Sequence, residues 1–190
     1  MEPQAAGRTT FLLVDGENLD ATLGTDILRH RPAPDERPRW DRVTEFLRQA
    51  WGQDVRGLFF LNASSGTMPM PFVQALLALG YRVIPLSGGK DEKVVDIGIQ
   101  RTLAALAGRD ADVALASHDA DFEEALRPLL GNRRVALLGF REYVSQRLAE
   151  LEPLGLQFFD MELAVGAFNI PLPRVRIITL DEFDPEHFLA

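Results

Sequence analysis

The feature that most constrains this 190-residue chain is a repeated alternation of short apolar runs with helical patterns. Runs such as VRGLFFLN are rich in β-branched and aromatic residues, which is typical of strands buried on both faces. The sequence predicts six such strands, at residues 9–15, 55–62, 81–86, 112–118, 133–140 and 156–161. Between them, apolar residues at helical spacing predict helices at 41–51, 71–79, over about 15 residues after 93, from 121 onward, and at 144–151.

Strands that alternate with helices favour a parallel sheet, because each crossover helix must pack back onto a face of the sheet. We therefore expect an α/β fold: a three-layer sandwich with a mostly parallel sheet of five or six strands and helices on both faces. The length suits one domain, which we place at residues 8–165. Residues 166–190 are expected to form a C-terminal extension with one extended piece and an acidic end.

Two segments are expected to lie outside the regular fold. Residues 20–38 contain RPAPDERP and are predicted to form a loop or a mobile insertion. The C-terminal extension carries the apolar residues Phe183, Phe188 and Leu189, for which we expect one of two partners: the body of the domain or another chain. A homodimer is therefore one of the predicted states.

Composition and charge limit the classes of function. The chain has no cysteine, which excludes disulfides, thiolate metal sites and cysteine nucleophiles and makes a cytoplasmic location the expectation. It has no apolar run long enough for a membrane span and no secretion signal at its start, so no membrane partner is expected. The formal net charge is −8, although phosphate binding favours a basic surface. Either metal ions neutralise a local group of acids, or nucleic acid is not the substrate.

Acidic residues follow three of the predicted strands. Asp15 ends the first strand, Asp96 follows the loop after the third, and Asp119 and Asp121 follow the fourth. Because the carboxyl ends of parallel strands meet at one edge of a sheet, these acids are expected to converge. Carboxylates held close together repel one another unless a cation or a proton lies among them. Hard oxygen ligands of this kind suit Mg²⁺ or Mn²⁺.

Each acid also has a simpler interpretation. Asp121 is equally compatible with a helix cap, and Asp15 with a turn after a strand. Lys93 and Asp96 are three residues apart on one helix and could form an ordinary surface ion pair. His118 is more often a structural or surface residue than a ligand. The metal site would be absent only if all these interpretations held together.

Three motifs resemble those of a known family. Residues 15–18 (DGEN) are similar to a D-x-E-N signature, and residues 93–96 (KVVD) to a K-x-x-D helix motif. Residues 117–122 (SHDADF) resemble S-G-D-S-D-F. In this order and spacing, the three resemble the motifs of NYN domains, a branch of the PIN-like nucleases. The resemblance covers residues 8–165.

The resemblance implies a PIN-like fold and a ribonuclease that depends on Mg²⁺ or Mn²⁺. It implies an acidic metal group of Asp15, Asp96, Asp119 and Asp121. It also implies that Asn18 positions a water, a ligand or the loop, that Lys93 is auxiliary, and that Ser117 orients the loop after the fourth strand. His118 and Ala120 depart from the family pattern, and the histidine is expected either to crowd the substrate or to contact a phosphate.

The leading hypothesis is a metal-dependent ribonuclease with RNA as its partner. The alternative is a non-catalytic regulatory module that binds a protein or a nucleotide. A dehalogenase-like phosphohydrolase is disfavoured because D-x-D is absent after the first strand, and a P-loop enzyme because its glycine-rich motif is absent. Cationic residues around the proline-rich segment form either an RNA-facing flap or a solvated loop: Arg29, His30, Arg31, Arg37, Arg39 and Arg42.

Overall fold

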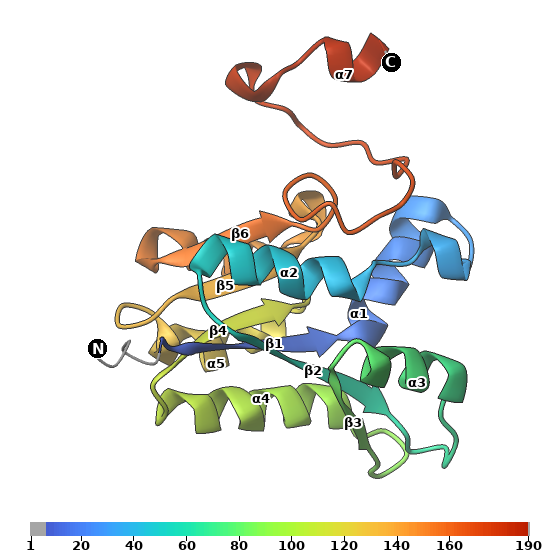
Figure 1. Ribbon diagram of the computed structural model, residues 1–190, viewed down its shortest axis with the longest axis vertical. Helices are drawn as coiled ribbons and strands as arrows, with labels where there is room; N and C mark the ends of the chain where they lie inside the picture. The colour runs from blue at the N-terminus through green and yellow to red at the C-terminus, as the bar shows by residue number, and fades with distance from the viewer. Residues whose placement is uncertain (1–6, 190) are drawn as a thin grey trace, which may run out of the picture.

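Six strands form one sheet in the order β3-β2-β1-β4-β5-β6, and every neighbouring pair is parallel (Figure 1). The computed structural model describes residues 7–189. The strands are β1 (Thr9–Asp15), β2 (Val55–Asn62), β3 (Arg82–Leu86), β4 (Ala111–Ala116), β5 (Val135–Gly139) and β6 (Leu156–Asp160). The predicted α/β fold is confirmed, with the larger of the two expected strand counts.

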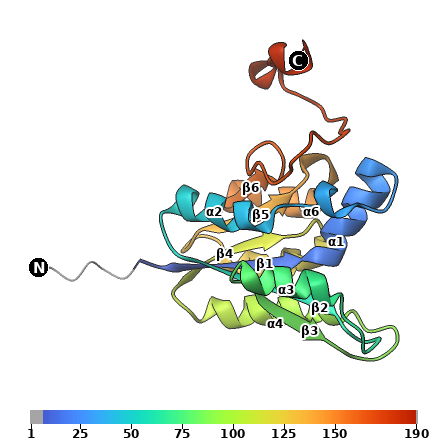
Figure 2. The same cartoon turned by 45° about the vertical axis from the view of Figure 1, so that its right-hand side comes forward.

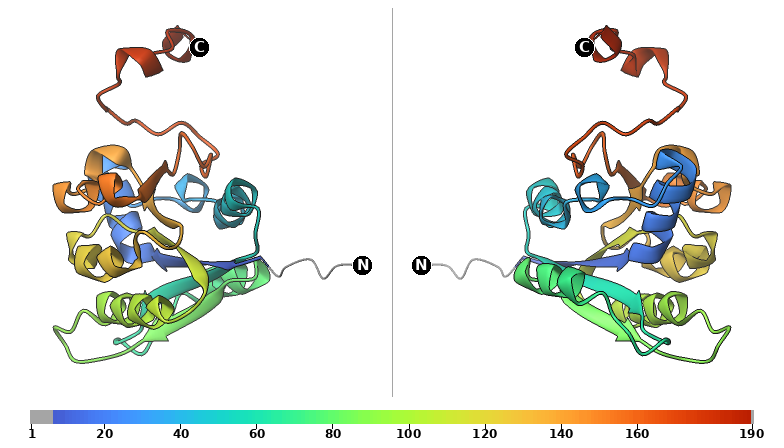
Figure 3. Two further views of the ribbon diagram at one scale, coloured as in Figure 1. Left: turned by 90° about the vertical axis from the view of Figure 1, so that its left-hand side faces the viewer. Right: turned by 90° about the vertical axis from the view of Figure 1, so that its right-hand side faces the viewer.

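The two faces of the sheet carry separate cores because successive side chains of a strand point to opposite sides. Leu12 and Val14 face α1 (Gly16–Ala21), α2 (Trp40–Trp51) and α3 (Met70–Ala78). Leu13 faces α4 (Val94–Ala107), α5 (Glu123–Leu126) and α6 (Gln146–Ala149). Figure 3 shows the resulting layers, with helices on both sides of the sheet. The predicted three-layer sandwich is therefore present.

The strand order reverses direction between β1 and β4. The chain first moves outward from β1 through β2 to β3, then returns to place β4 beside β1 and continues outward to β6. In open parallel sheets, ligands bind beyond the carboxyl ends of the strands at such a reversal. The segments that follow β1 and β4 therefore meet at the favoured place for a site.

The prediction of a loop over residues 20–38 is wrong for its first half. Helix α1 continues into a π-helical stretch, Thr22–Leu28, which ends at Arg29 with a left-handed φ of 64°. Leu23 and Ile27 are four residues apart and almost fully buried, with 1% and 4% exposed. Their burial against the sheet outweighs the local polarity of the segment. Only the proline-rich part after Arg29 is irregular, apart from a 3₁₀ turn, Pro34–Glu36.

Two further helices are shorter than predicted. The helix expected from residue 121 consists of α5 between two 3₁₀ turns, because Pro128 lacks the N–H that would continue it. The helix expected at 144–151 is reduced to α6, whose first turn is capped by the Ser145 hydroxyl. The chain then passes into a 3₁₀ turn, Glu152–Leu154, that contains Pro153.

The C-terminal segment divides into a packed part and a projecting part. Ala167 and Leu172 belong to the core, with 0% and 8% exposed. Beyond Arg174 the chain runs away from the sheet to α7 (Glu186–Leu189), as Figures 1 and 2 show. Phe183 and Phe188 are about half exposed and stack on each other, with ring centroids 5.7 Å apart. The domain boundary at residue 165 and a contact with another chain stay predictions.

Candidate metal centre

Three acids converge beyond the carboxyl ends of the strands. Asp96, Asp119 and Asp121 each place one carboxylate oxygen within 4.8 Å of the others. Asp96 lies in the first turn of α4, whereas Asp119 and Asp121 lie in the turn after β4. The Asp119 carboxylate also accepts a hydrogen bond of 2.9 Å from the Asp121 N–H, so the residue that caps this turn is Asp119 and not Asp121. The predicted convergence of these segments is seen in the structure.

Asp15 lies behind this group and is nearly inaccessible. Only 3% of it is exposed, and its carboxylate accepts hydrogen bonds from the Ser117 hydroxyl at 3.0 Å and the Asn18 N–H at 3.4 Å. Burial raises the pKa of Asp15 to about 6, and the negative charges of Asp96 and Asp119 add to this against the opposing effect of the two hydrogen bonds. A fourth carboxylate thus lies close enough for the charges of Asp96 and Asp119 to raise its pKa.

The raised pKa of Asp15 predicts a pH dependence of stability. Between about pH 4 and pH 6 the folded protein binds a proton at Asp15 that the unfolded chain has lost, so the metal-free protein should lose stability as pH rises through this range. Asp15→Asn should remove this slope and raise the free energy of unfolding at pH 7 by roughly 2–3 kcal/mol. Urea unfolding in EDTA at pH 5 and pH 7 measures the difference, with Asp54→Asn as the matched control. Parallel pH profiles for wild type and Asp15→Asn would contradict the prediction.

Asn18 and Ser117 connect the ends of β1 and β4. The Asn18 side-chain oxygen accepts a hydrogen bond of 2.8 Å from the His118 N–H. The Ser117 hydroxyl lies 3.2 Å from that same oxygen and accepts a hydrogen bond of 3.2 Å from the Asp119 N–H. Asn18 was expected to position a water, a ligand or the loop. These contacts correspond to positioning the loop.

His118 points into the domain and away from the acids. Only 7% of it is exposed, and its Nε2 accepts a hydrogen bond of 2.7 Å from the Phe140 N–H. Its Nδ1 lies 3.4 Å from the Thr22 hydroxyl, and burial lowers the pKa of the imidazole to about 4. A neutral, enclosed ring neither crowds a substrate nor contacts a phosphate. His118 stands where the family motif has glycine, and we expected it either to crowd the substrate or to contact a phosphate. Both expectations are wrong, and His118 is structural.

Lys93 places a cation beside the acids. Its ammonium lies 3.3 Å from Asp121 Oδ2 and 3.6 Å from Asp96 Oδ2, with 68% of the side chain exposed. The hydrogen bond to Asp121 is the largest cause of the raised pKa of Lys93. One ammonium offsets only part of the charge of four carboxylates. The crowded oxygen donors that remain fit a hard divalent cation, which Asp96, Asp119 and Asp121 would hold, with Asp15 behind them.

Most of the cations of the proline-rich segment already have partners within the protein. Arg37 pairs with Asp20, Arg39 with Asp41, and His30 with Glu36. Arg42 donates to backbone carbonyls of the C-terminal segment. These side chains stabilise the local structure, which favours the interpretation of this segment as a solvated loop over that of an RNA-facing flap.

Sequence reasoning missed two residues that link segments at the carboxyl ends of the strands. The Glu17 carboxylate accepts a hydrogen bond of 3.3 Å from the Asn62 N–H and so links the ends of β1 and β2. Its place inside the D-x-E-N motif was an available signal. Arg174 binds the loops beyond β5 and β6, and no local motif marks it.

The structure is thus an open parallel α/β sheet with acidic residues gathered beyond its reversal point. Residues 9–153 match the NYN domain family, and the chain belongs to that family, a branch of the PIN-like nucleases. The fold is similar to the crystal structure of a protein of unknown function from Vibrio parahaemolyticus, with a TM-score of 0.61 and 20% identity over 83% of this chain and 95% of that one. No curated protein matches the sequence. None of the helices within residues 7–189 is long and apolar enough to cross a membrane.

Proposed function

We propose that the protein is a ribonuclease that hydrolyses phosphodiester bonds of RNA with Mg²⁺ or Mn²⁺ held by its acidic group. The observation that carries this proposal is the convergence of Asp96, Asp119 and Asp121 within 4.8 Å at the reversal point of the sheet. Membership in the NYN family supports a nuclease over other metal-dependent enzymes.

The residues of the site have separable tasks in this reaction. Asp96, Asp119 and Asp121 hold the cation, and the buried Asp15 adds charge behind them. When bound, the cation supplies an activated water and stabilises the leaving oxygen. Lys93 is exposed and lies beside the acids, so its ammonium is placed to bind a phosphate oxygen of the substrate. Asn18 and Ser117 hold the turn that carries Asp119.

The net charge of −8 opposes the approach of RNA. Lys93 and a divalent cation reduce this repulsion at the point of cleavage, so binding of RNA should depend on the metal. A cytoplasmic location and a homodimer belong to the same proposal. The exposed apolar tail favours the alternative of a binding module for a protein partner, because Val175 and Ile177 are 93% and 96% exposed.

The first test measures metal binding and cleavage side by side. Labelled RNAs of mixed structure are incubated with the full chain in Mn²⁺, in Mg²⁺ and in EDTA, and we expect cleavage only with a metal. Because an ion that binds only the folded state stabilises it, Mn²⁺ at about 100 times its Kd should add about 2.7 kcal/mol, visible as a higher Tm. Asp54→Asn, an exposed acid at the opposite edge of the sheet, should behave like wild type. Metal binding without cleavage of any RNA would favour the binding module, and no metal binding would contradict both site and function.

A further inference from the structure

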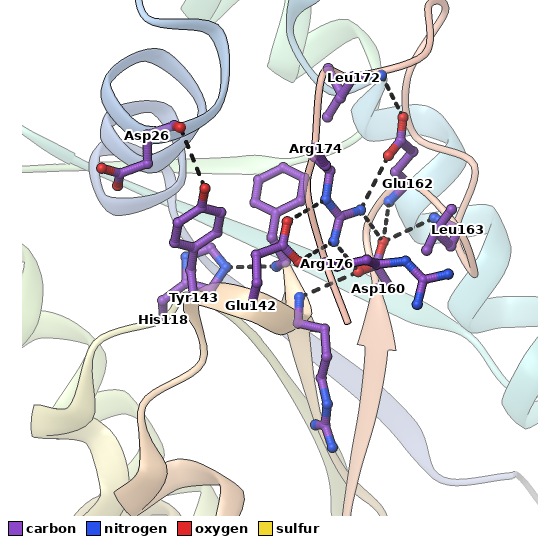
Figure 4. A network of polar contacts seen from close by, with 12 residues as sticks. Asp26, His118, Glu142, Tyr143, Asp160, Glu162, Leu163, Leu172, Arg174 and Arg176 are labelled. Atoms are coloured by element: carbon purple, nitrogen blue, oxygen red, sulfur yellow. Dashed lines mark hydrogen bonds and ion pairs between the residues drawn. The ribbon is translucent and has the colours of Figure 1, made fainter. Parts of the chain in front are cut away.

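A buried arginine from the C-terminal segment lies at the centre of a dense polar network (Figure 4). Only 3% of the Arg174 side chain is exposed. Its guanidinium forms paired hydrogen bonds of 2.6–2.7 Å with both Glu142 and Asp160, and one of 3.2 Å with Glu162. These bonds use all five N–H donors of the side chain. We call Arg174 and these three carboxylates the Arg174 clasp.

The clasp joins elements that are far apart in sequence. Glu142 lies in the 3₁₀ turn after β5, and Asp160 is the last residue of β6. Burial tends to raise the pKa of Asp160, but the hydrogen bonds and the charge of Arg174, together with the backbone N–H groups of Leu163 and Arg141, hold that pKa below its usual range. The pKa of Glu142 is also lowered, because hydrogen bonds from Arg174 and from the backbone act against its burial. Both carboxylates are therefore charged, and the arginine fixes the two strand ends to each other.

From the clasp, packing continues to His118. The Arg174 guanidinium lies over the Phe140 ring, 4.9 Å from its centroid. The Phe140 ring stacks on the His118 imidazole, with ring centroids 5.7 Å apart. The backbone N–H of Phe140 donates to His118 Nε2. The Tyr143 ring contacts the same imidazole edge-on at 6.3 Å, and its hydroxyl donates to the Asp26 carbonyl at 3.4 Å. The imidazole is thus enclosed by the loop that Arg174 holds.

From His118 the contacts reach the acids. The backbone N–H of His118 donates to the side-chain oxygen of Asn18. The same oxygen lies beside the Ser117 hydroxyl. That hydroxyl donates to Asp15 and accepts from the Asp119 N–H. A continuous series of contacts therefore joins Arg174 to the turn after β4, although no hydrogen bond or ion pair links Arg174 to the acids of the candidate metal centre.

We infer that Arg174 is a positioning residue for the acidic site, acting through Phe140 and His118 on the turn that carries Asp119. The packed part of the C-terminal segment then completes the functional domain, beyond the residues matched by the family. This inference rests on the proposed function, since it assigns Arg174 a task in holding that site.

The test needs a variant that leaves no buried charge unpaired, because removing one partner of such a pair can unfold the protein. Arg174→Met is compared with the triple variant Arg174→Met, Glu142→Gln, Asp160→Asn in the full chain. The control is Asp112→Asn, which weakens a buried network at the amino end of β4, far from the acids. All measurements are made at least ~15 °C below each Tm, a margin of about four times or more the shift of about 2–4 °C that ~1 kcal/mol produces in a chain of this size.

Three readouts separate positioning from general stability. In wild type, ¹⁵N shifts of the imidazole should report a neutral His118 with its proton on Nδ1, since Nε2 accepts from Phe140. Both Arg174 variants should show a changed tautomer population, an affinity for Mn²⁺ lowered about tenfold or more, and a kcat lowered more than KM is raised. Asp112→Asn should change none of the three.

Unchanged His118 signals in the Arg174 variants would overturn the inference, whatever the activity. Changed signals with unaltered Mn²⁺ affinity and kcat would also overturn it, because the clasp would then hold the loop but not the site. A wild-type protein that neither binds Mn²⁺ nor cleaves RNA would overturn the proposed function instead, and that result comes before any variant is made.

Discussion

Asp119→Asn is expected to lower RNA cleavage by about 10³-fold while it leaves the fold intact. Losing one anionic ligand costs the bound cation several kcal/mol of charge stabilisation, and each 1.36 kcal/mol is tenfold in rate. Asp119 is central among the acids because its negative charge raises the pKa of both Asp15 and Asp96. Asparagine keeps a side-chain oxygen for the hydrogen bond from the Asp121 N–H, so the turn itself should persist.

The same substitution should stabilise the protein when no metal is bound. Relief of repulsion with two neighbouring carboxylates should raise the Tm in EDTA by a few degrees, which corresponds to roughly 1 kcal/mol. The stabilisation by Mn²⁺ should be lost. Single-turnover cleavage and thermal melts with and without Mn²⁺ measure both effects, with Asp54→Asn as the control. Full cleavage by Asp119→Asn would remove this residue from the catalytic group.

Gly139→Ala should destabilise the protein by about 2–5 kcal/mol and reduce cleavage by tenfold or more. A Cβ at this position would lie 2.5 Å from His118 Nε2, which is closer than the atoms can approach. The imidazole must then leave its place and lose the hydrogen bond from Phe140, so that overpacking adds to an unpaired buried N–H. The turn that carries Asp119 should lose its support at the same time.

Urea unfolding and cleavage rates test this prediction. Gly108→Ala is the matched control, because its nearest contact is 3.9 Å away and its backbone conformation suits alanine. The double variant Gly139→Ala, His118→Ala should recover part of the lost stability, since the clash is gone. If Gly139→Ala unfolds like wild type and the double variant shows no recovery, the placement of the imidazole is wrong.

The strands and the acid cluster were predictable because their signals are local. An apolar run such as TTFLLV predicts a buried strand whatever surrounds it, and an acid directly after it must lie at the strand's carboxyl end. Parallel topology then brings Asp15 and Asp119 to the same edge without further information. The extent of the π-helical stretch was harder, because Gly24 and the polar residues around it are typical of a turn. The spacing of Leu19, Leu23 and Ile27 was the signal for the helix.

The supporting contacts were not predictable because their partners are distant in sequence. His118 meets the Phe140 N–H across 22 residues, and Arg174 meets Glu142 across 32. Neither residue type reveals a buried role by itself, since histidine and arginine are more often exposed. Arg174 also lies in a proline-rich stretch, PLPRVR, that resembles a surface tail. Such roles appear only when the folded positions of both partners are known.

The reversal of strand order between β1 and β4 also controls when the site can form during synthesis. The Ser117 hydroxyl and the Asp15 carboxylate that it binds are 102 residues apart. Strand β4 can pair with β1 only after β2, β3 and α4 have been made, so a growing chain carries Asp15 long before it carries Asp119. A nascent chain that ends before β4 therefore has no cluster of acids to gather a cation. The ribonuclease activity proposed above would in this way be absent through most of the protein's own translation.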